Sequence, residues 1–151
     1  MKTGEIVTDE YLQRHFDGAS RVITESGYTQ KRHEREIMIA QWLCDTFGGN
    51  IVLISEDGSQ YGEKRADYIW EGKYWELKTV HTLKAIDSSL RKGITQIHDK
   101  PGGIILELEK IKSPLGAVRG AIDNRISISC RIPLDIMIIQ NKNLLEVIRY
   151  K

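Results

Sequence analysis

The stretch of residues 65–79 constrains the fold of this chain more than any other, because it reads as two β-strands joined by a tight turn. Aromatic and aliphatic residues flank Glu71-Gly72, and glycine supplies the positive φ that a two-residue turn needs. With that turn, Asp67 lies opposite Glu76 on the neighbouring strand. Side chains alternate along a strand, so Lys78 points to the same face as the two carboxylates.

Two carboxylates that face each other directly destabilise a hairpin by up to about 1 kcal/mol, so Asp67 and Glu76 require a compensating cation. A divalent metal bound by both side chains supplies it, and oxygen-only ligation suits Mg²⁺ or Mn²⁺ better than Zn²⁺. Lys78 would then lie near an attacking water or near the charge that develops on a phosphate. The alternative is a solvated surface pair, because Glu-x-Lys is common on exposed strands.

Asp67 followed by Glu76-Leu77-Lys78 resembles the PD-(D/E)xK signature of restriction-endonuclease-like nucleases, although Ala66 stands where that signature has proline. The fuller text, 66–70 and 74–79, is similar to the C-terminal toxin domains of contact-dependent growth inhibition (CdiA) proteins and to related domains in phage and mobile-element proteins. The resemblance implies a metal-dependent endonuclease with tRNA as its first-choice substrate and DNA as the next. It also implies a cognate immunity protein as a partner.

Residues 31–47 repeat apolar side chains at helical spacing, and Gly48-Gly49 ends this predicted helix. In restriction-endonuclease-like folds a carboxylate of the first helix often reaches the active site. The resemblance therefore nominates Glu36 as a further metal ligand or water-positioning group, with Glu34 second. An acidic first turn that complements the helix dipole explains either residue equally well. Glu56, after a predicted strand over 51–54, is a further possible ligand.

A second helix is predicted after the hairpin, with Ile86, Leu90, Ile94 and Ile97 as its buried stripe. The rest of this region carries basic and imidazole side chains that could grip the phosphates of a substrate. The predicted substrate-binding residues are His81, Lys84, Arg91, Lys92 and His98. A merely solvated helix face is an equal alternative.

The order of predicted elements gives an α/β fold with a mixed sheet flanked by helices. It matches an αβββαβ restriction-endonuclease-like core followed by a C-terminal hairpin. Residues 1–30, with a short helix over 8–16, form a predicted lead-in to a nuclease domain of residues 31–151. The remaining elements are a strand over 104–108, a helix from Ser113-Pro114 to Asn124, and strands over 134–139 and 144–150.

The 151 residues are 40% hydrophobic, enough for one domain with an ordinary core. The net charge of +1 lacks the basic excess that is common in proteins that bind nucleic acids irrespective of sequence. No stretch has the length of a membrane span or the pattern of a signal peptide. We therefore expect a cytoplasmic site of action, for a free protein or for the excised terminal domain of a larger exported or phage-associated one.

Two other functions remain open from the residues alone. A metal-independent ribonuclease of the barnase, EndoU or RelE kind would use His81 or His98, with Lys78 and Arg91, for acid, base and phosphate-binding work. In that case Asp67 and Glu76 would be structural. The other is a non-enzymatic nucleic-acid-binding module, which would have the restriction-endonuclease-like fold but no catalytic activity.

Overall fold

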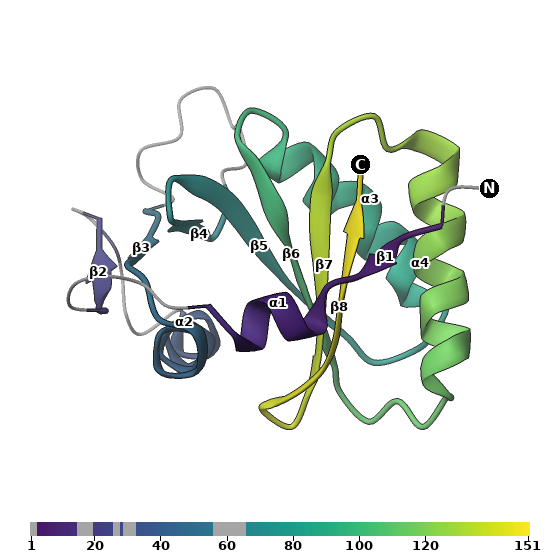
Figure 1. Ribbon diagram of the computed structural model, residues 1–151, viewed down its shortest axis with the longest axis horizontal. Coiled ribbons are helices and arrows are strands. Elements are labelled where there is room, and N and C mark those ends of the chain that lie inside the picture. The colour runs from purple at the N-terminus through teal and green to yellow at the C-terminus, as the bar shows by residue number, and fades with distance from the viewer. Residues whose placement is uncertain (1–2, 15–19, 26–27, 29–32, 56–65) are drawn as a thin grey trace.

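The computed structural model describes residues 3–14, 20–25, 28, 33–55 and 66–151. Glu56, a possible metal ligand in the sequence, lies outside this part of the chain. The described residues form a single mixed sheet with helices on both of its faces (Figure 1), so the predicted α/β class is confirmed. Of the helices described, none combines the length and the apolar character needed to span a bilayer.

The sheet has eight strands in the order β1-β8-β7-β6-β5-β4-β3-β2, from right to left in Figure 1. The pairs β2/β3, β5/β6 and β6/β7 are parallel, and the other four are antiparallel. The strands are β1 Glu5–Ile6, β2 Val22–Thr24, β3 Ile51–Leu53, β4 Tyr68–Trp70, β5 Lys73–Val80, β6 Pro101–Leu108, β7 Leu134–Gln140 and β8 Asn143–Tyr150.

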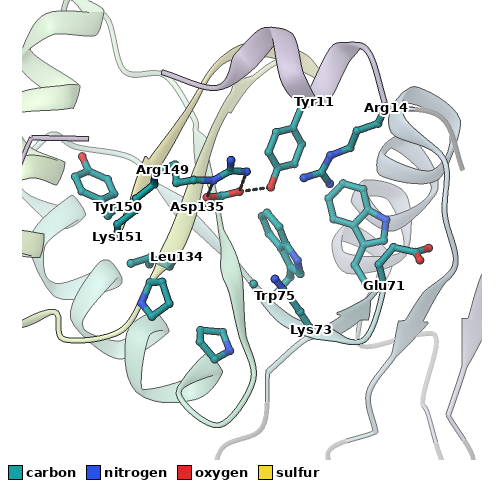
Figure 2. Close-up of a pocket in the computed structure, with 14 residues that line it drawn as sticks. Tyr11, Arg14, Glu71, Lys73, Trp75, Leu134, Asp135, Arg149, Tyr150 and Lys151 are labelled. Atoms are coloured by element: carbon teal, nitrogen blue, oxygen red, sulfur yellow. Dashed lines mark hydrogen bonds and ion pairs between the residues drawn. The ribbon is translucent and has the colours of Figure 1, made fainter. Parts of the chain in front are cut away.

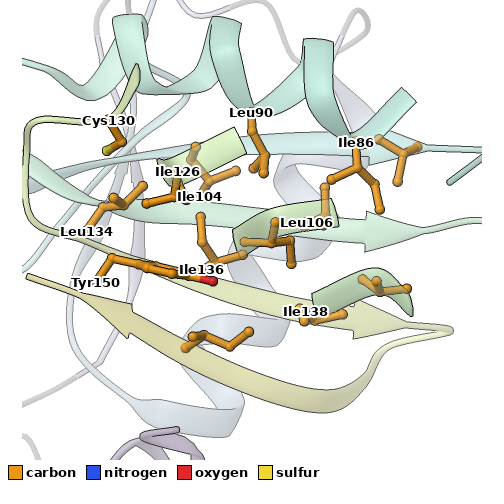
Figure 3. Packing of buried hydrophobic residues seen from close by; sticks show 14 of the residues in the cluster. Ile86, Leu90, Ile104, Leu106, Ile126, Cys130, Leu134, Ile136, Ile138 and Tyr150 are labelled. Carbon is orange, nitrogen blue, oxygen red and sulfur yellow. The ribbon is translucent and has the colours of Figure 1, made fainter. Parts of the chain in front are cut away.

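The described residues include four helices that cover the sheet: α1 Thr8–Leu12, α2 Glu34–Phe47, α3 Ala85–Ile97 and α4 Leu115–Ser129. Side chains of α3 and α4 pack on one face, where Leu90 and Ile126 meet Ile104 and Ile136 (Figure 3). Side chains of α1 and α2 form a second apolar cluster, which includes Leu43 and Trp70. Because the inner strands are covered on both faces, β6 and β7 read as nearly continuous apolar runs.

The central hairpin forms as predicted. Tyr68 pairs with Trp75 and Trp70 with Lys73, so the turn consists of Glu71-Gly72. Both turn residues have positive φ, 51° at Glu71 and 79° at Gly72, and this backbone is the type I′ turn that fits the twist of the flanking strands. The prediction had assigned positive φ to the glycine alone.

Several predicted boundaries differ from the structure. The first helix ends at Leu12 rather than at residue 16, because Tyr11 is its one buried residue and little packing supports a longer helix. Pro114 is the N-cap of α4 and not its first residue, and α4 continues to Ser129 because Ile126 extends the buried stripe. The segment predicted as a lead-in contributes β1, α1 and β2 to the sheet and its cover.

Candidate functional site

Two carboxylates meet at the open end of the central hairpin. The backbone N–H of Asp67 donates to Glu76 Oε1 over 2.9 Å, and the backbone N–H of Leu77 donates to Asp67 Oδ2 over 2.8 Å. Asp67 directly precedes β4 and Glu76 lies within β5, so each side chain is held by the backbone of the opposite segment. This exchange confirms the predicted juxtaposition of Asp67 and Glu76.

Lys78 also belongs to this group. Its Nζ lies 3.1 Å from Glu76 Oε2, and the Lys78 side chain is 20% exposed whereas that of Glu76 is 3% exposed. Burial of Glu76, followed by the negative charge of Asp67, raises the pKa of Glu76 to about 9, although Lys78 acts in the opposite direction. One ammonium group therefore offsets only part of the cost of holding these carboxylates together.

Glu36 reaches the same place from the first turn of α2. Its backbone carbonyl accepts a hydrogen bond from the Tyr68 hydroxyl over 2.7 Å, which ties α2 to β4. Tyr28 donates to Glu36 Oε2 over 3.1 Å, and His33 Nδ1 lies 3.2 Å from Glu36 Oε1. Burial and then the charge of Asp67 raise the pKa of Glu36 to about 7. Glu36 thus joins the site, whereas Glu34 is exposed on the same turn.

We call Glu36, Asp67, Glu76 and Lys78 the carboxylate cluster. Its donor atoms are hard oxygens, which suit Mg²⁺ or Mn²⁺. Within the described ranges, no three His, Cys, Asp or Glu side chains are arranged as a ready metal site. Asp67 and Glu76 nevertheless fit a Mg²⁺-like ion that takes two protein carboxylates and completes its shell with water and substrate oxygens. Burial, followed by the charge of Asp67, raises the pKa of both Glu36 and Glu76, and a bound cation would oppose both effects because it favours the charged carboxylates.

Helix α3 closes over the cluster at Gly93. A Cβ added there would lie 2.8 Å from Ile104 Cδ1 and 3.7 Å from Lys78 Cε. The absence of a side chain lets the helix approach the sheet closely and confines the Lys78 stem. Sequence patterning did not identify this role, because glycine in a helix gives no signal of what lies opposite.

The five predicted substrate-binding residues are all exposed. His81 pairs with Glu109 over 3.8 Å and His98 with Asp99 over 3.6 Å, with exposed side-chain fractions of 64% and 67%. The other three are exposed: Lys84 is the N-cap of α3, and Arg91 and Lys92 lie on its outer side. No ion pair joins any of the five to the cluster in the part of the chain that the structure describes. Their predicted contact with substrate stays a prediction.

A second buried carboxylate lies on β6, at the face covered by α2. Glu107 Oε1 accepts hydrogen bonds from Arg35 Nε over 2.6 Å and from the Thr79 hydroxyl over 2.8 Å. Glu107 is 4% exposed, so these partners satisfy a charge that would otherwise be costly to bury. Sequence reasoning missed it because Glu107 interrupts an apolar strand without any motif around it.

No family model and no curated protein matches this chain. Among solved structures, it is similar to a chain of the CdiA-CT/CdiI toxin and immunity complex from Burkholderia pseudomallei, with a TM-score of 0.55 and 15% sequence identity. The match covers 85% of this chain and 99% of that chain. At this identity the likeness establishes a shared fold alone. It agrees with the predicted relation to CdiA systems at that level, while the PD-(D/E)xK assignment stays a prediction.

Proposed function

We propose that this chain is a nuclease of the toxin type, which cleaves phosphodiester bonds of RNA, with tRNA as the first substrate to test. The observation that carries the proposal is the carboxylate cluster: Glu36, Asp67 and Glu76 lie together in a partly buried site, where the described residues place one ammonium group, that of Lys78, beside Glu76. A purely structural role does not explain the carboxylate cluster, because like charges held together at low solvent exposure destabilise the folded state.

Within the cluster, Asp67 and Glu76 would hold Mg²⁺ or Mn²⁺. The ion would polarise the scissile phosphate and lower the pKa of a bound water. Lys78, fixed by Glu76 and by the close approach of Gly93, would offset the negative charge that grows on the phosphate. Glu36, with a pKa near 7, can accept a proton from the attacking water at neutral pH.

The fold likeness supports a place in a toxin and immunity system. That complex contains two kinds of protein, and the carboxylate cluster favours the toxin for this chain, because binding a toxin does not require buried, opposed carboxylates. A cognate immunity protein is the expected partner, and the cytoplasm is the expected place of action. The choice of RNA over DNA rests on the resemblance of residues 66–79 to tRNA-cleaving toxin domains.

A second candidate is a metal-independent ribonuclease centred on His33, whose Nδ1 lies 3.2 Å from Glu36 Oε1. The side chain of His33 is only 14% exposed, and the imidazole and the carboxylate could divide the acid and base roles in attack by a 2′-hydroxyl. The candidates predicted from sequence for this mechanism, His81 and His98, are highly exposed and pair with Glu109 and Asp99 instead.

The test is cleavage of total tRNA and of plasmid DNA by the purified chain, with Mg²⁺, with Mn²⁺ and with EDTA. Four proteins are compared: the parent, Glu76→Gln, His33→Gln, and Glu34→Gln as an exposed carboxylate control. Cleavage that disappears with EDTA and with Glu76→Gln, and that persists in Glu34→Gln, supports the proposal. Cleavage that survives EDTA but is lost in His33→Gln selects the second candidate. A folded parent protein that cleaves neither substrate refutes both.

A further inference from the structure

A pocket of about 540 Å³ opens at the other end of the central hairpin, away from the carboxylate cluster. Its wall combines Tyr11 of α1 and Arg14, which lies two residues beyond that helix, with the end of β4, the starts of β5, β6 and β7, and the end of β8 (Figure 2). We call it the Arg14 pocket. Its ionisable lining includes four cations and two carboxylates, namely Arg14, Lys73, Arg149, Lys151, Glu71 and Asp135. Its volume is in the usual range for small-ligand sites.

Both carboxylates of the lining are already occupied. Asp135 Oδ1 accepts from Arg149 Nε over 3.0 Å, and Asp135 Oδ2 accepts from the Tyr11 hydroxyl (Figure 2). Glu71 Oε1 accepts from the backbone N–H of Asn50 over 2.9 Å. Asp135 is thus paired with Arg149, whereas Glu71 accepts from a neutral backbone N–H, and neither carboxylate forms an ion pair with Arg14 or Lys73 among the described residues.

Three groups that line the pocket, the side chains of Arg14 and Lys73 and the Trp75 indole N–H, are possible hydrogen-bond donors to a ligand. The Arg14 guanidinium lies 3.5 Å from the centroid of the Tyr11 ring, and neither Arg14 nor Lys73 forms an ion pair with a described residue. The Trp75 indole N–H also has no acceptor in the described chain, whereas the Trp70 indole N–H donates to the Gly48 carbonyl over 3.1 Å.

Gly102 keeps the Trp75 indole N–H open to the pocket. A Cβ at that position would lie 2.4 Å from Trp75 Nε1 and would overlap it. The pocket wall therefore presents an N–H donor with no acceptor among the described residues, between segments that also supply Arg14 and Lys73, two cations without an ion pair in that part of the chain. Only the side-chain oxygens of Gln96 and Glu146 are buried without a partner among the described residues, so water can reach the Trp75 indole N–H, and an oxygen atom of a bound ligand would accept from it in place of that water.

The exposed surface of the pocket decides which ligand class fits. Tyr11, Trp70 and Trp75 are 1%, 2% and 4% exposed, so their rings offer no free face on which a base could stack. What the pocket offers is N–H donors and positive charge, the combination that recognises oxyanions. We propose that the Arg14 pocket binds a phosphate or diphosphate group through Arg14, Lys73 and the Trp75 indole N–H. This inference does not rest on the nuclease proposal, because it requires no catalysis.

The test follows the three indole N–H signals, from Trp42, Trp70 and Trp75, in ¹H–¹⁵N spectra of the full chain during titration with pyrophosphate. The Trp75 signal should move and saturate with a dissociation constant of about 1 mM or tighter, while the Trp42 signal stays in place. The variant Arg14→Gln/Lys73→Gln should bind at least about tenfold more weakly, because it removes two charge-assisted hydrogen bonds. The matched control is Lys112→Gln/Arg131→Gln, which removes two exposed cations elsewhere.

Two further titrations identify the source of the phosphate. A short RNA with a 5′-phosphate and the same RNA with a 5′-hydroxyl are added separately, in EDTA so that metal-dependent cleavage cannot interfere. Equal shifts of the Trp75 signal with both RNAs assign the pocket to backbone phosphates. Shifts with pyrophosphate alone, or with the 5′-phosphorylated RNA but not its counterpart, assign it to terminal or free phosphate groups. An unmoved Trp75 signal, an unsaturated one, or equal binding by the double variant overturns the proposal.

Discussion

Replacing Glu76 by glutamine should stabilise the metal-free protein. Burial and the neighbouring Asp67 charge raise the pKa of Glu76 from 4.5 to about 9, so at pH 7 folding requires this carboxyl to take up a proton. The pH interval from 4.5 to 7 corresponds to about 3 kcal/mol at about 1.4 kcal/mol per unit. Glutamine keeps the Oε1 acceptor used by the Asp67 N–H and has no charge to bury. We expect a gain of about 1–3 kcal/mol at pH 7.

The sign of the pH dependence follows from the raised pKa. A carboxyl whose pKa is higher in the folded state contributes fully to stability below pH 4.5, and that contribution is lost as pH rises towards about 9. The free energy of unfolding of the parent should therefore fall between these limits, and Glu76→Gln should flatten the fall. Glu34→Gln, in an exposed position of α2, should behave like the parent.

The assay is urea unfolding in EDTA at pH 5, 6, 7 and 8, repeated with Mg²⁺ or Mn²⁺. The metal should stabilise the parent most at high pH, where it replaces the proton, and should stabilise Glu76→Gln much less. Equal or lower stability of Glu76→Gln in EDTA at pH 8 would refute the reasoning. In that case the contacts of the Glu76 carboxylate would stabilise the folded state by more than its repulsion from Asp67 destabilises it.

Three further changes test other parts of the structure. Gly93→Ala should destabilise the protein by about 1–3 kcal/mol in urea unfolding, because its Cβ would press on Ile104 Cδ1; unchanged stability would show that α3 can shift freely. Lys142→Gly should stabilise it by about 0.5–1 kcal/mol, because φ is 59° there; a lower melting temperature would contradict this. Glu107→Leu should cost about 1–3 kcal/mol, since the buried carboxylate accepts from the Thr79 hydroxyl; a neutral effect in thermal unfolding would remove that role.

The hairpin could be predicted because all of its information is local. Two strands, a turn at Glu71-Gly72 and the alternation of side chains are enough to place Asp67 opposite Glu76 and Lys78 on the same face. A shift of one residue would turn Glu76 to the other face, so the apolar pattern that fixes the register also fixes the site.

Other parts of the site depend on contacts that no local pattern carries. The helix that carries Glu36 was predictable from its apolar stripe. Its position along β4 depends on the hydrogen bond from the Tyr68 hydroxyl to the Glu36 carbonyl, between residues 32 positions apart. His33 reaches Glu36 only because the chain enters α2 at that point. The Arg14 pocket combines distant segments of the sequence, and nothing around Arg14 or Gly102 distinguishes them in the sequence. Such sites require the tertiary structure.

The exchange of hydrogen bonds between Asp67 and the strand that carries Glu76 also bears on the order in which the protein folds. These residues are nine positions apart, and hairpins close within about 1–10 μs, well before the parallel pairing of β5 with β6. We therefore expect the two carboxylates to repel each other already in the transition state for folding, before the final packing steps. In EDTA the refolding rate should consequently fall as pH rises, while the unfolding rate changes little. A divalent cation that binds the closed hairpin would then accelerate folding as well as complete the site.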